Sequence, residues 1–286
     1  MTKLKIKDMK LLITALFLTF ILGGFWFFFF QGKEDDTRQW LSEKKEEVFP
    51  AKTESDNGGF ETLEFNFSDE ESLEDLPWHL TLVKVSPQDF DFRLVLNQKD
   101  ALMSIEDIAQ ENNCEVAMNG VFFDSKFDPL GLIVEDGKVI NSAHTGELAS
   151  GVFYVTNDYK ADIVPYSDYV VEDDVLALQS GPLILKADGS TEISENSIEK
   201  DARSFLGVDE EGFVYLGIVY PKTERGWQGV SLYELAKMFQ DSEDNIGIKM
   251  KAVLNLDGGS STGLYTKYSH YSEKNLPENV ICLGER

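Results

Sequence analysis

The sequence predicts a sheet-dominated α+β domain that follows one N-terminal transmembrane helix. Residues 11–30 form an apolar run without a charged side chain. From about residue 60, many short segments alternate apolar and polar residues, which is typical of half-buried β-strands. Only two segments have helical spacing, against roughly ten predicted strands, so sheet dominates the fold. The 286 residues suffice for one sizeable core and do not require two.

The N-terminal run, "LLITALFLTFILGGFWFFFF", has about the length that crosses ~30 Å of hydrocarbon as a helix. A cleavable signal peptide has a shorter apolar core of roughly 7–15 residues, so we predict an uncleaved signal anchor over residues 11–30. Lysines precede the run and "KEDD" follows it, which places residues 1–10 in the cytoplasm as a basic tail. The predicted localisation is the cell membrane, single-pass, with the domain on the extracytoplasmic side.

The remainder of the chain is strongly acidic. Residues 31–59 are polar and charged and predict an acidic linker, with the folded domain over residues 60–286. The formal net charge is −25. Because four lysines against one aspartate give residues 1–10 a charge of +3, the chain beyond them carries about −28. Such a surface repels nucleic acid, so nucleic acid is not an expected partner.

The elements of the domain follow from alternation and turn signals. Alternation predicts strands over residues 61–67, 79–85, 91–97 and 114–119, with a helix over 104–113 before the last of them. Residues 130–140 and 204–219 each hold two apolar runs about a polar turn and predict β-hairpins. Residues 175–189 predict strand, turn and strand, and 230–239 predict the second helix. A last apolar run leads into "NLDGGSSTGLY" at residues 255–265.

Cysteines and histidines are few. Cys114 and Cys282 either pair in an oxidising compartment or remain two buried thiols, and both alternatives stay open. His79, His144 and His270 show no clustering typical of a metal site. Neither a P-loop nor a dinucleotide-binding fingerprint is present. The sequence therefore predicts no metal and no cofactor.

The segment "NLDGGSSTGLY" contains a pattern that resembles a hydrolase nucleophile. Gly259, Ser261 and Gly263 satisfy G-x-S-x-G, the nucleophile elbow. That elbow needs a helix after it and an acid and then a histidine further along the chain. The following "LYTKYSHY" has strand composition, and His270 precedes the remaining glutamates. A serine hydrolase is therefore disfavoured.

Asp257 is the candidate catalytic carboxylate of this segment. We expect it to end a strand, with Asn255 on the same face because side chains two apart point the same way. Gly258 and Gly259 let the backbone turn sharply and approach a ligand closely, and Ser260 follows them. The alternative is an Asx turn, in which the aspartate bonds only its own backbone.

Four other polar residues have a structural and a functional interpretation. Glu234 lies three residues after Ser231, the spacing of a capping box, and this structural explanation is favoured. Arg203 is either an ordinary exposed arginine or a residue whose planar guanidinium group binds a carboxylate or a phosphate. Asn119 and Gln179 each precede a glycine-containing turn and suit either a turn or a ligand contact.

In their order along the chain, several blocks resemble the phosphodiester glycosidase family. They are "NGVFFD", "PLGLIVEDGKV", "LQSGPLIL", "ARSFLGVDEEG", "VSLYELAKMF", "AVLNLDGGSST" and "LPENVICLG". The resemblance covers roughly residues 75 to 284 and implies a phosphodiester glycosidase-like α+β domain. It also implies a set of polar site residues: Asp257 and Glu234 as catalytic carboxylates, and Asn119, Gln179, Arg203, Gly258, Gly259 and Ser260 as substrate-binding groups.

The activity that the resemblance implies is hydrolysis of a sugar-1-phosphodiester, which leaves a phosphomonoester. We expect the partner to be a phosphate-containing glycan of the exopolysaccharide or cell wall, with the membrane contacted through the N-terminal helix. In this scheme Asp257 acts as nucleophile or as base for water, and Arg203 holds the phosphate. The alternative function is a catalytically inactive module that binds glycan or assists exopolysaccharide assembly with the same fold.

Overall fold

The structure, a computed structural model, describes residues 50–55, 59–67, 78–171, 174–221 and 229–286. The predicted basic tail, the apolar run over residues 11–30 and most of the predicted linker lie outside the described residues. No helix within the described ranges is long and apolar enough to cross a membrane. The chain divides into two compact units, and every described residue belongs to the second, Val48–Arg286.

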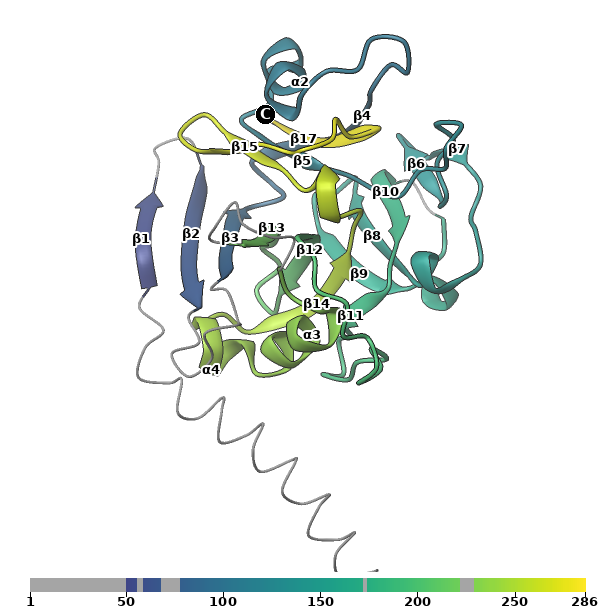
Figure 1. The fold of residues 1–286 in the computed structure, drawn as a ribbon. Helices are drawn as coiled ribbons and strands as arrows, with labels where there is room; N and C mark the ends of the chain where they lie inside the picture. The colour runs from purple at the N-terminus through teal and green to yellow at the C-terminus, as the bar shows by residue number, and fades with distance from the viewer. Residues whose placement is uncertain (1–49, 56–58, 68–77, 172–173, 222–228) are drawn as a thin grey trace, which may run out of the picture. The chain divides into compact units, whose positions relative to one another are not determined.

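Seven antiparallel strands form the largest of the three sheets in the described residues (Figure 1). In spatial order they are β1 (Pro50–Ser55), β2 (Phe60–Phe67), β3 (Trp78–Val85), β13 (Val214–Pro221), β12 (Arg203–Asp209), β14 (Met250–Asn255) and β11 (Leu183–Leu185). Strand β1 lies within the stretch predicted as linker. Its sequence, "PAKTES", has no apolar alternation, so only the pairing with β2 reveals it.

Two five-stranded antiparallel sheets complete the domain. One has the order β7 (Lys138–Asn141), β6 (Ile133–Glu135), β10 (Asp174–Ser180), β8 (Gly151–Thr156) and β9 (Ala161–Pro165). The other has the order β16 (His270–Tyr271), β15 (Leu264–Thr266), β5 (Val116–Asn119), β17 (Asn279–Glu285) and β4 (Phe90–Leu96). The sheet-dominated α+β prediction is confirmed. Strands outnumber the expectation because β1, β8, β9 and β17 lie outside the segments predicted as strands.

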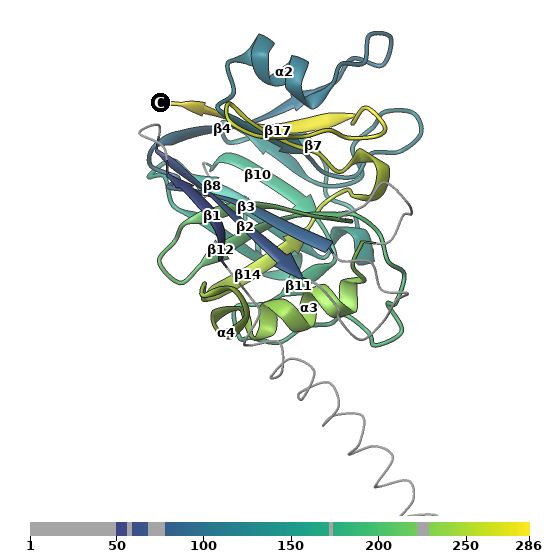
Figure 2. The same cartoon turned by 60° about the vertical axis from the view of Figure 1, so that its left-hand side comes forward.

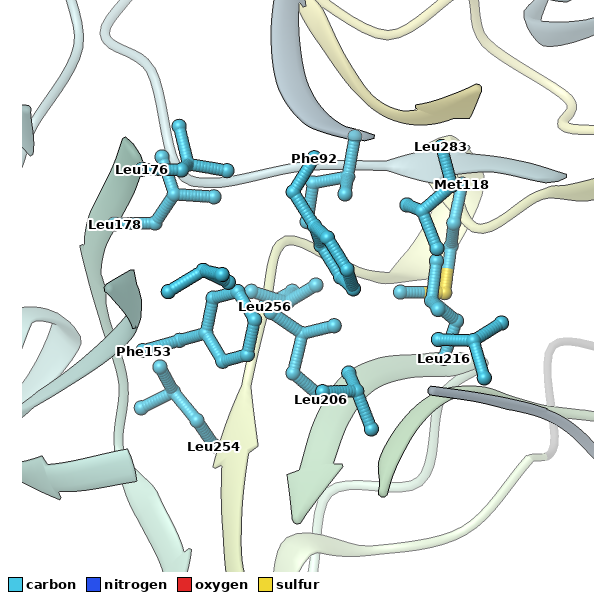
Figure 3. Close-up of a cluster of buried hydrophobic side chains, with 14 of the residues drawn as sticks. Phe92, Met118, Phe153, Leu176, Leu178, Leu206, Leu216, Leu254, Leu256 and Leu283 are labelled. Atoms are coloured by element: carbon cyan, nitrogen blue, oxygen red, sulfur yellow. The ribbon is translucent and has the colours of Figure 1, made fainter. Parts of the chain in front are cut away.

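The apolar faces of the three sheets meet in one core (Figure 3). Phe153 and Leu178 come from one five-stranded sheet, Phe92 and Met118 from the other, and Leu206 from the seven-stranded sheet. All five side chains are at most 2% exposed. Burial of a large apolar side chain stabilises a fold by roughly 1.5–3 kcal/mol. Packing through these side chains therefore holds the three sheets, and the ends of their strands, in fixed positions.

The helices lie at two opposite sides of the sheets, with α2 (Ile105–Asn112) on one side and α3 (Leu232–Gln240) and α4 (Ser242–Ile246) on the other (Figure 2). α2 begins at Ser104, whose side chain accepts the N–H of Asp107 at 3.1 Å, and ends at Asn113, which has a left-handed φ of 53°. α3 begins with the predicted capping box at Ser231. Both predicted helices are confirmed.

Both predicted hairpins are confirmed as β6–β7 and β12–β13. The strand–turn–strand prediction over residues 175–189 also holds, as β10 and β11. These two strands do not pair with each other, because β10 joins a five-stranded sheet and β11 joins the edge of the seven-stranded sheet. The short connection at Gly181–Pro182 therefore links two layers of the domain.

A disulfide joins Cys114 and Cys282, whose Cα atoms are 5.4 Å apart. Of the two alternatives that the sequence left open, the structure has the disulfide. It connects the loop after α2 to strand β17, although 168 positions separate the two residues in sequence.

Candidate active site

The loop between β14 and β15 contains the predicted turn at Asp257, Gly258 and Gly259. Strand β14 ends at Asn255, so Asp257 lies two residues beyond the strand rather than at its end. The Asn255 side chain is buried and donates to two backbone carbonyls inside the domain, at 3.0 and 2.9 Å. The 3-10 turn η4 (Gly259–Ser261) then redirects the chain toward β15.

The turn lies close against residues 201–203, which leaves little space for a side chain at either glycine. Gly259 has a φ of +63°, and a Cβ atom there would lie 3.0 Å from Oδ2 of Asp201. A Cβ atom on Gly258 would lie 3.0 Å from the carbonyl oxygen of Ala202. The N–H of Gly259 donates to that same carbonyl at 2.8 Å. The turn is therefore a close contact of backbone with backbone.

The carboxyl group of Asp257 is largely buried within this turn. It accepts a hydrogen bond from the N–H of Gly258 at 3.0 Å and another from the Ser261 side chain. Burial raises the pKa of Asp257 to about 6; the two hydrogen bonds oppose the rise, and the charge of Glu278 adds to it. A carboxyl group that titrates near neutrality can act as acid, base or nucleophile at physiological pH.

Asn119 holds the turn in place from the end of β5. Its side-chain nitrogen donates to the backbone carbonyl of Asp257 at 2.6 Å. Its side-chain oxygen accepts the hydroxyl of Ser204 at 2.7 Å and the N–H of Gly263 at 3.2 Å. Asn119 is fully buried. Its predicted role as a direct substrate contact therefore gives way to a positioning role, because these internal bonds engage both ends of its amide.

Arg203 lies beside the turn at the start of β12. Its Nε donates to the carbonyl of Val230 at 3.1 Å, and Nη2 donates to the carbonyl of Glu199 at 2.6 Å. The other terminal nitrogen, Nη1, has no hydrogen-bond partner in the part of the chain that the structure describes. Burial lowers the pKa of Arg203, and the charges of Asp201 and Glu199 oppose that shift. Arg203 is thus anchored by two carbonyls and keeps the N–H groups of Nη1 for a ligand.

Glu234 forms the capping box that its spacing predicts. Its Oε2 accepts the N–H of Ser231 at 2.8 Å and the Ser231 hydroxyl at 2.9 Å, while Ser231 Oγ accepts the N–H of Glu234 at 3.1 Å. Its other oxygen pairs with Lys200 Nζ at 3.3 Å. These contacts account for both carboxylate oxygens, and none of them reaches Asp257.

Gln179 lies in β10, and its bonds run away from the glycine turn. Its Oε1 accepts the N–H groups of Leu132 and His144, at 2.9 and 3.0 Å. Its Nε2 donates to the carbonyls of His144 and Ala149, at 2.9 and 2.8 Å. With 1% of its surface exposed, Gln179 fixes the loop between β7 and β8. The structure therefore does not bring it to Asp257 as a ligand group.

The predicted backbone donors of the turn also have internal partners. The N–H of Gly258 is bonded to the Asp257 carboxylate, and that of Gly259 to Ala202. Ser260 ties the turn to the C-terminal loop: its Oγ accepts Asn275 Nδ2 at 2.8 Å, and its carbonyl accepts the N–H groups of Lys274 and Asn275, each at 2.9 Å.

Sequence reasoning missed several residues around the turn. Asp201, Thr262, Tyr271 and Lys274 line a hollow against Gly259. The signal available for Asp201 was its place two residues before Arg203; the others had none, because loop contacts leave no periodicity. In the described ranges no group of three or more His, Cys, Asp and Glu side chains is arranged to hold a metal ion.

Substitution of Glu234 tests its role in the capping box. Glu234→Gln keeps an oxygen that accepts the Ser231 N–H and loses an exposed ion pair worth about 0–1 kcal/mol, so its Tm should stay close to that of the parent. Glu234→Ala removes the half of the capping box that accepts the Ser231 N–H and should cost about 1 kcal/mol. Thermal unfolding measures both, with Ser231→Ala as the matched loss of the other half of the box. Equal destabilisation by Gln and Ala would contradict the capping role.

The raised pKa of Asp257 predicts a pH-dependent stability. Because the folded-state value lies above the ordinary value of 3.8, ionisation of Asp257 opposes folding, and this cost is complete above about pH 6. Asp257→Asn removes the charge, so its Tm should exceed that of the parent above about pH 7, and the difference should shrink toward about pH 4. Thermal unfolding across this range measures the difference.

Asp188→Asn is the control for that series. Hydrogen bonds from Ser190 lower the pKa of the exposed Asp188, so its substitution should give no Tm gain above pH 6. If Asp257→Asn were no more stable than the parent at any pH, the buried ionised carboxylate would be ruled out.

Known proteins match the part of the chain that contains this site. The sequence model of the phosphodiester glycosidase family matches residues 112–283. The chain is 30% identical to the mouse N-acetylglucosamine-1-phosphodiester alpha-N-acetylglucosaminidase over 219 residues, which cover 64% of this chain and 40% of that protein. It is 31% identical over 117 residues to the uncharacterized Escherichia coli protein YigE, covering 38% of this chain and 46% of that protein. The chain spans less than half the length of these curated relatives.

Solved structures share the fold. The zebrafish N-acetylglucosamine-1-phosphodiester alpha-N-acetylglucosaminidase catalytic domain, auto-inhibited by its pro-peptide, matches with a TM-score of 0.61 and 21% identity, over 84% of this chain and 88% of that chain. A hypothetical protein from Synechocystis matches with a TM-score of 0.54 and 16% identity, over 84% and 64% of the two chains. Since the family match includes Asn119, Arg203 and the glycine turn, the chain belongs to the phosphodiester glycosidase family.

Proposed function

We propose that this chain is a membrane-anchored extracytoplasmic hydrolase that cleaves the glycosidic bond of a sugar-1-phosphodiester in exopolysaccharide or cell-wall glycan metabolism. The observation that carries the proposal is the largely buried Asp257 carboxyl, whose pKa is about 6, on a turn inside the family segment. Family membership supports hydrolysis of a sugar phosphodiester, which is the activity that the name of the mouse relative describes.

The chemistry of the leaving group makes one ionised carboxylate sufficient. A sugar-1-phosphodiester releases a phosphomonoester, whose second pKa is about 6, so it departs without full protonation. Asp257 in its ionised form then acts at the anomeric carbon, as nucleophile or as base for the attacking water. The bond from the anomeric carbon to oxygen breaks, water supplies the new hydroxyl group, and the proton of that water ends on the carboxylate or the phosphate.

Arg203 is the proposed phosphate ligand. Its Nε and Nη2 are fixed by backbone carbonyls, which holds the guanidinium in one orientation with Nη1 left for an acceptor. A charge-assisted bond to a phosphate oxygen is roughly twice as strong as a neutral one. Because Asp201 and Glu199 lie near this guanidinium, Arg203 is less attractive to anions than an isolated arginine.

Turnover tests this proposal directly. The full-length chain, in a polyoxyethylene detergent that contains no sugar, is incubated with an alkyl phosphodiester of N-acetylglucosamine-1-phosphate in oxygen-18 water. Mass spectrometry should find the label in the sugar, which shows that the carbon–oxygen bond broke. Asp257→Asn should lower kcat by at least ~10²-fold, and Glu234→Gln should retain most activity. In the parent, kcat/KM should rise through about pH 6 as Asp257 ionises.

Arg203→Ala tests whether Arg203 binds the phosphate or only stabilises the backbone through its hydrogen bonds. It should reduce kcat/KM for the phosphodiester more than for a neutral aryl glycoside of the same sugar, because only the first carries the proposed phosphate contact. The Tm of this variant measures the stability that is lost with the hydrogen bonds to Val230 and Glu199. Label in the phosphate instead of the sugar would refute cleavage of the carbon–oxygen bond. Near-normal turnover by Asp257→Asn would refute the catalytic role of Asp257. Equal losses on both substrates for Arg203→Ala would refute the phosphate contact of Arg203. Sugar binding without any turnover would instead favour the inactive glycan-binding alternative.

The membrane topology is tested on intact cells. The apolar run at residues 11–30 and the lysines before it motivate the proposed anchor, and the Cys114–Cys282 disulfide is of a kind that persists in oxidising compartments. Protease added to intact cells or spheroplasts should release the domain. A cytoplasmic protein serves as the control for intactness. Cleavage of the domain only after lysis would overturn the orientation.

A further inference from the structure

The loop between β16 and β17 is bonded to the glycine turn. The carbonyl of Ser260 accepts the N–H groups of Lys274 and Asn275, each at 2.9 Å, and its Oγ accepts Asn275 Nδ2 at 2.8 Å. Ser260 lies in η4 next to Ser261, whose side chain donates to the Asp257 carboxylate. The position of the β16–β17 loop therefore helps to hold the turn that presents Asp257.

Glu273, in the same loop, connects it to a helix. Its Oε1 accepts the N–H of Ile105, the first residue of α2, at 3.0 Å. Its Oε2 is buried and has no hydrogen-bond partner among the described residues. A Cβ atom on Gly263 would lie 3.1 Å from this Oε2 and 2.6 Å from the side chain of Ile105. The missing side chain of Gly263 therefore lets the carboxylate, the helix and the segment after the glycine turn pack against one another.

Capping of α2 alone does not explain the place of Glu273. Ser104 already caps this helix end, where its Oγ accepts the N–H of Asp107 at 3.1 Å. A negative charge near a helix N-terminus is typically worth about 0.3–1 kcal/mol, whereas a buried oxygen without a donor costs roughly 1–3 kcal/mol. The burial of Oε2 therefore offsets most of what the cap contributes. The remaining consequence of the contact is that it fixes the β16–β17 loop.

The helix that Glu273 contacts is itself held firmly. α2 lies against β5, β15 and β17 (Figure 1), and Ile105 and Ile108 are buried in one apolar cluster with residues of β5 and β17. The disulfide ties Cys114, just after the helix, to Cys282 in β17. Glu273 thus attaches the β16–β17 loop to a rigid element rather than to another loop.

We propose that Glu273 is a positioning residue of the candidate active site: by joining the β16–β17 loop to α2, it keeps the glycine turn and the Asp257 carboxyl in their buried position. The catalytic consequence of this inference rests on the proposed function, whereas the position of Asp257 is a property of the folded chain. Loss of the Glu273 contact lets water reach the turn, so the charge of Asp257 then costs less stability. A misplacement of about 1 Å can also lower a rate ~10²-fold.

A double-mutant cycle on the full-length chain measures this coupling without turnover. Asp257→Asn should raise the Tm of the parent above about pH 7, because it removes a buried charge. In a Glu273→Ala background that gain should fall to about half or less, because Asp257 is then less buried. Glu273→Gln keeps an oxygen that accepts the Ile105 N–H, so most of the gain should return in this background.

Ser104→Ala is the matched control. It removes the other cap at the same end of α2, at a cost of about 1 kcal/mol, while its side-chain hydrogen bonds involve only Asp107. The gain from Asp257→Asn should therefore be unchanged in this background.

Asn275→Ala is a second test of the loop that does not touch α2. Asn275 is exposed, so its substitution should leave the chain folded even if Glu273→Ala does not fold. It removes the side-chain bond from the loop to Ser260 and should also reduce the gain from Asp257→Asn.

The pH dependence of kcat/KM tests the catalytic consequence. The limb that reports Asp257 should lie near pH 6 in the parent and at least ~0.5 pH lower in Glu273→Ala, with kcat reduced ~10-fold or more. Glu273→Gln removes the same charge but should keep the limb near its parent position, and so should Ser104→Ala. The charged groups around the turn are the same in all these variants: Asp201, Arg203, Lys274 and Glu278.

The outcomes separate this inference from the proposed activity. A gain that is reduced by Glu273→Ala and Asn275→Ala but not by Ser104→Ala supports the positioning role even if no substrate is hydrolysed. Equal gains in the Glu273→Ala and Ser104→Ala backgrounds would overturn it and leave Glu273 as a helix cap, even if the parent hydrolyses the phosphodiester. If Glu273→Ala does not fold, an undiminished gain in Asn275→Ala overturns it. Absence of the gain in the parent would also overturn it, since no buried charge would then be held.

Discussion

The buried side chain of Asn119 is the interaction on which the rest of the candidate site depends. From the end of β5 it bonds the carbonyl of Asp257, the hydroxyl of Ser204 and the N–H of Gly263. Together with Asn119 these residues come from three different parts of the chain, and 138 positions separate Asn119 from Asp257. A buried amide in this position is costly unless both of its ends are bonded, so the same bonds that satisfy it also fix the turn.

The fixed turn explains how one carboxyl group acquires an unusual acidity. The Asp257 side chain is held where burial raises its pKa to about 6, and only the Gly258 and Ser261 donors limit the rise. The absence of side chains at Gly258 and Gly259 lets residues 201–203 lie directly against the turn, which brings Arg203 and Asp201 next to it. The cost in stability and the capacity for chemistry have one physical origin, the partial desolvation of a charge.

The polar residues implied by the family resemblance separate into two groups in the structure. Asp257 and Arg203 keep atoms that can act on a ligand, while Asn119, Gln179 and Glu234 are engaged in bonds that shape the backbone around them. A residue can therefore belong to a motif because it builds the site rather than because it touches the substrate.

The sequence by itself determined the elements whose signals are local. Alternation gave β2, β3 and β4, cap spacing gave both helices, and the polar turns gave the two hairpins, because each of these depends on neighbours a few residues apart. Tertiary structure alone decided three things: the pairing of β1, the separation of β10 from β11 into different sheets, and the Cys114–Cys282 bond. It also decided that Asn119 and Gln179 are buried and bonded within the domain, whereas Asp201 lies against Gly259 of the turn. These outcomes depend on contacts between residues far apart in the chain, which no local pattern encodes.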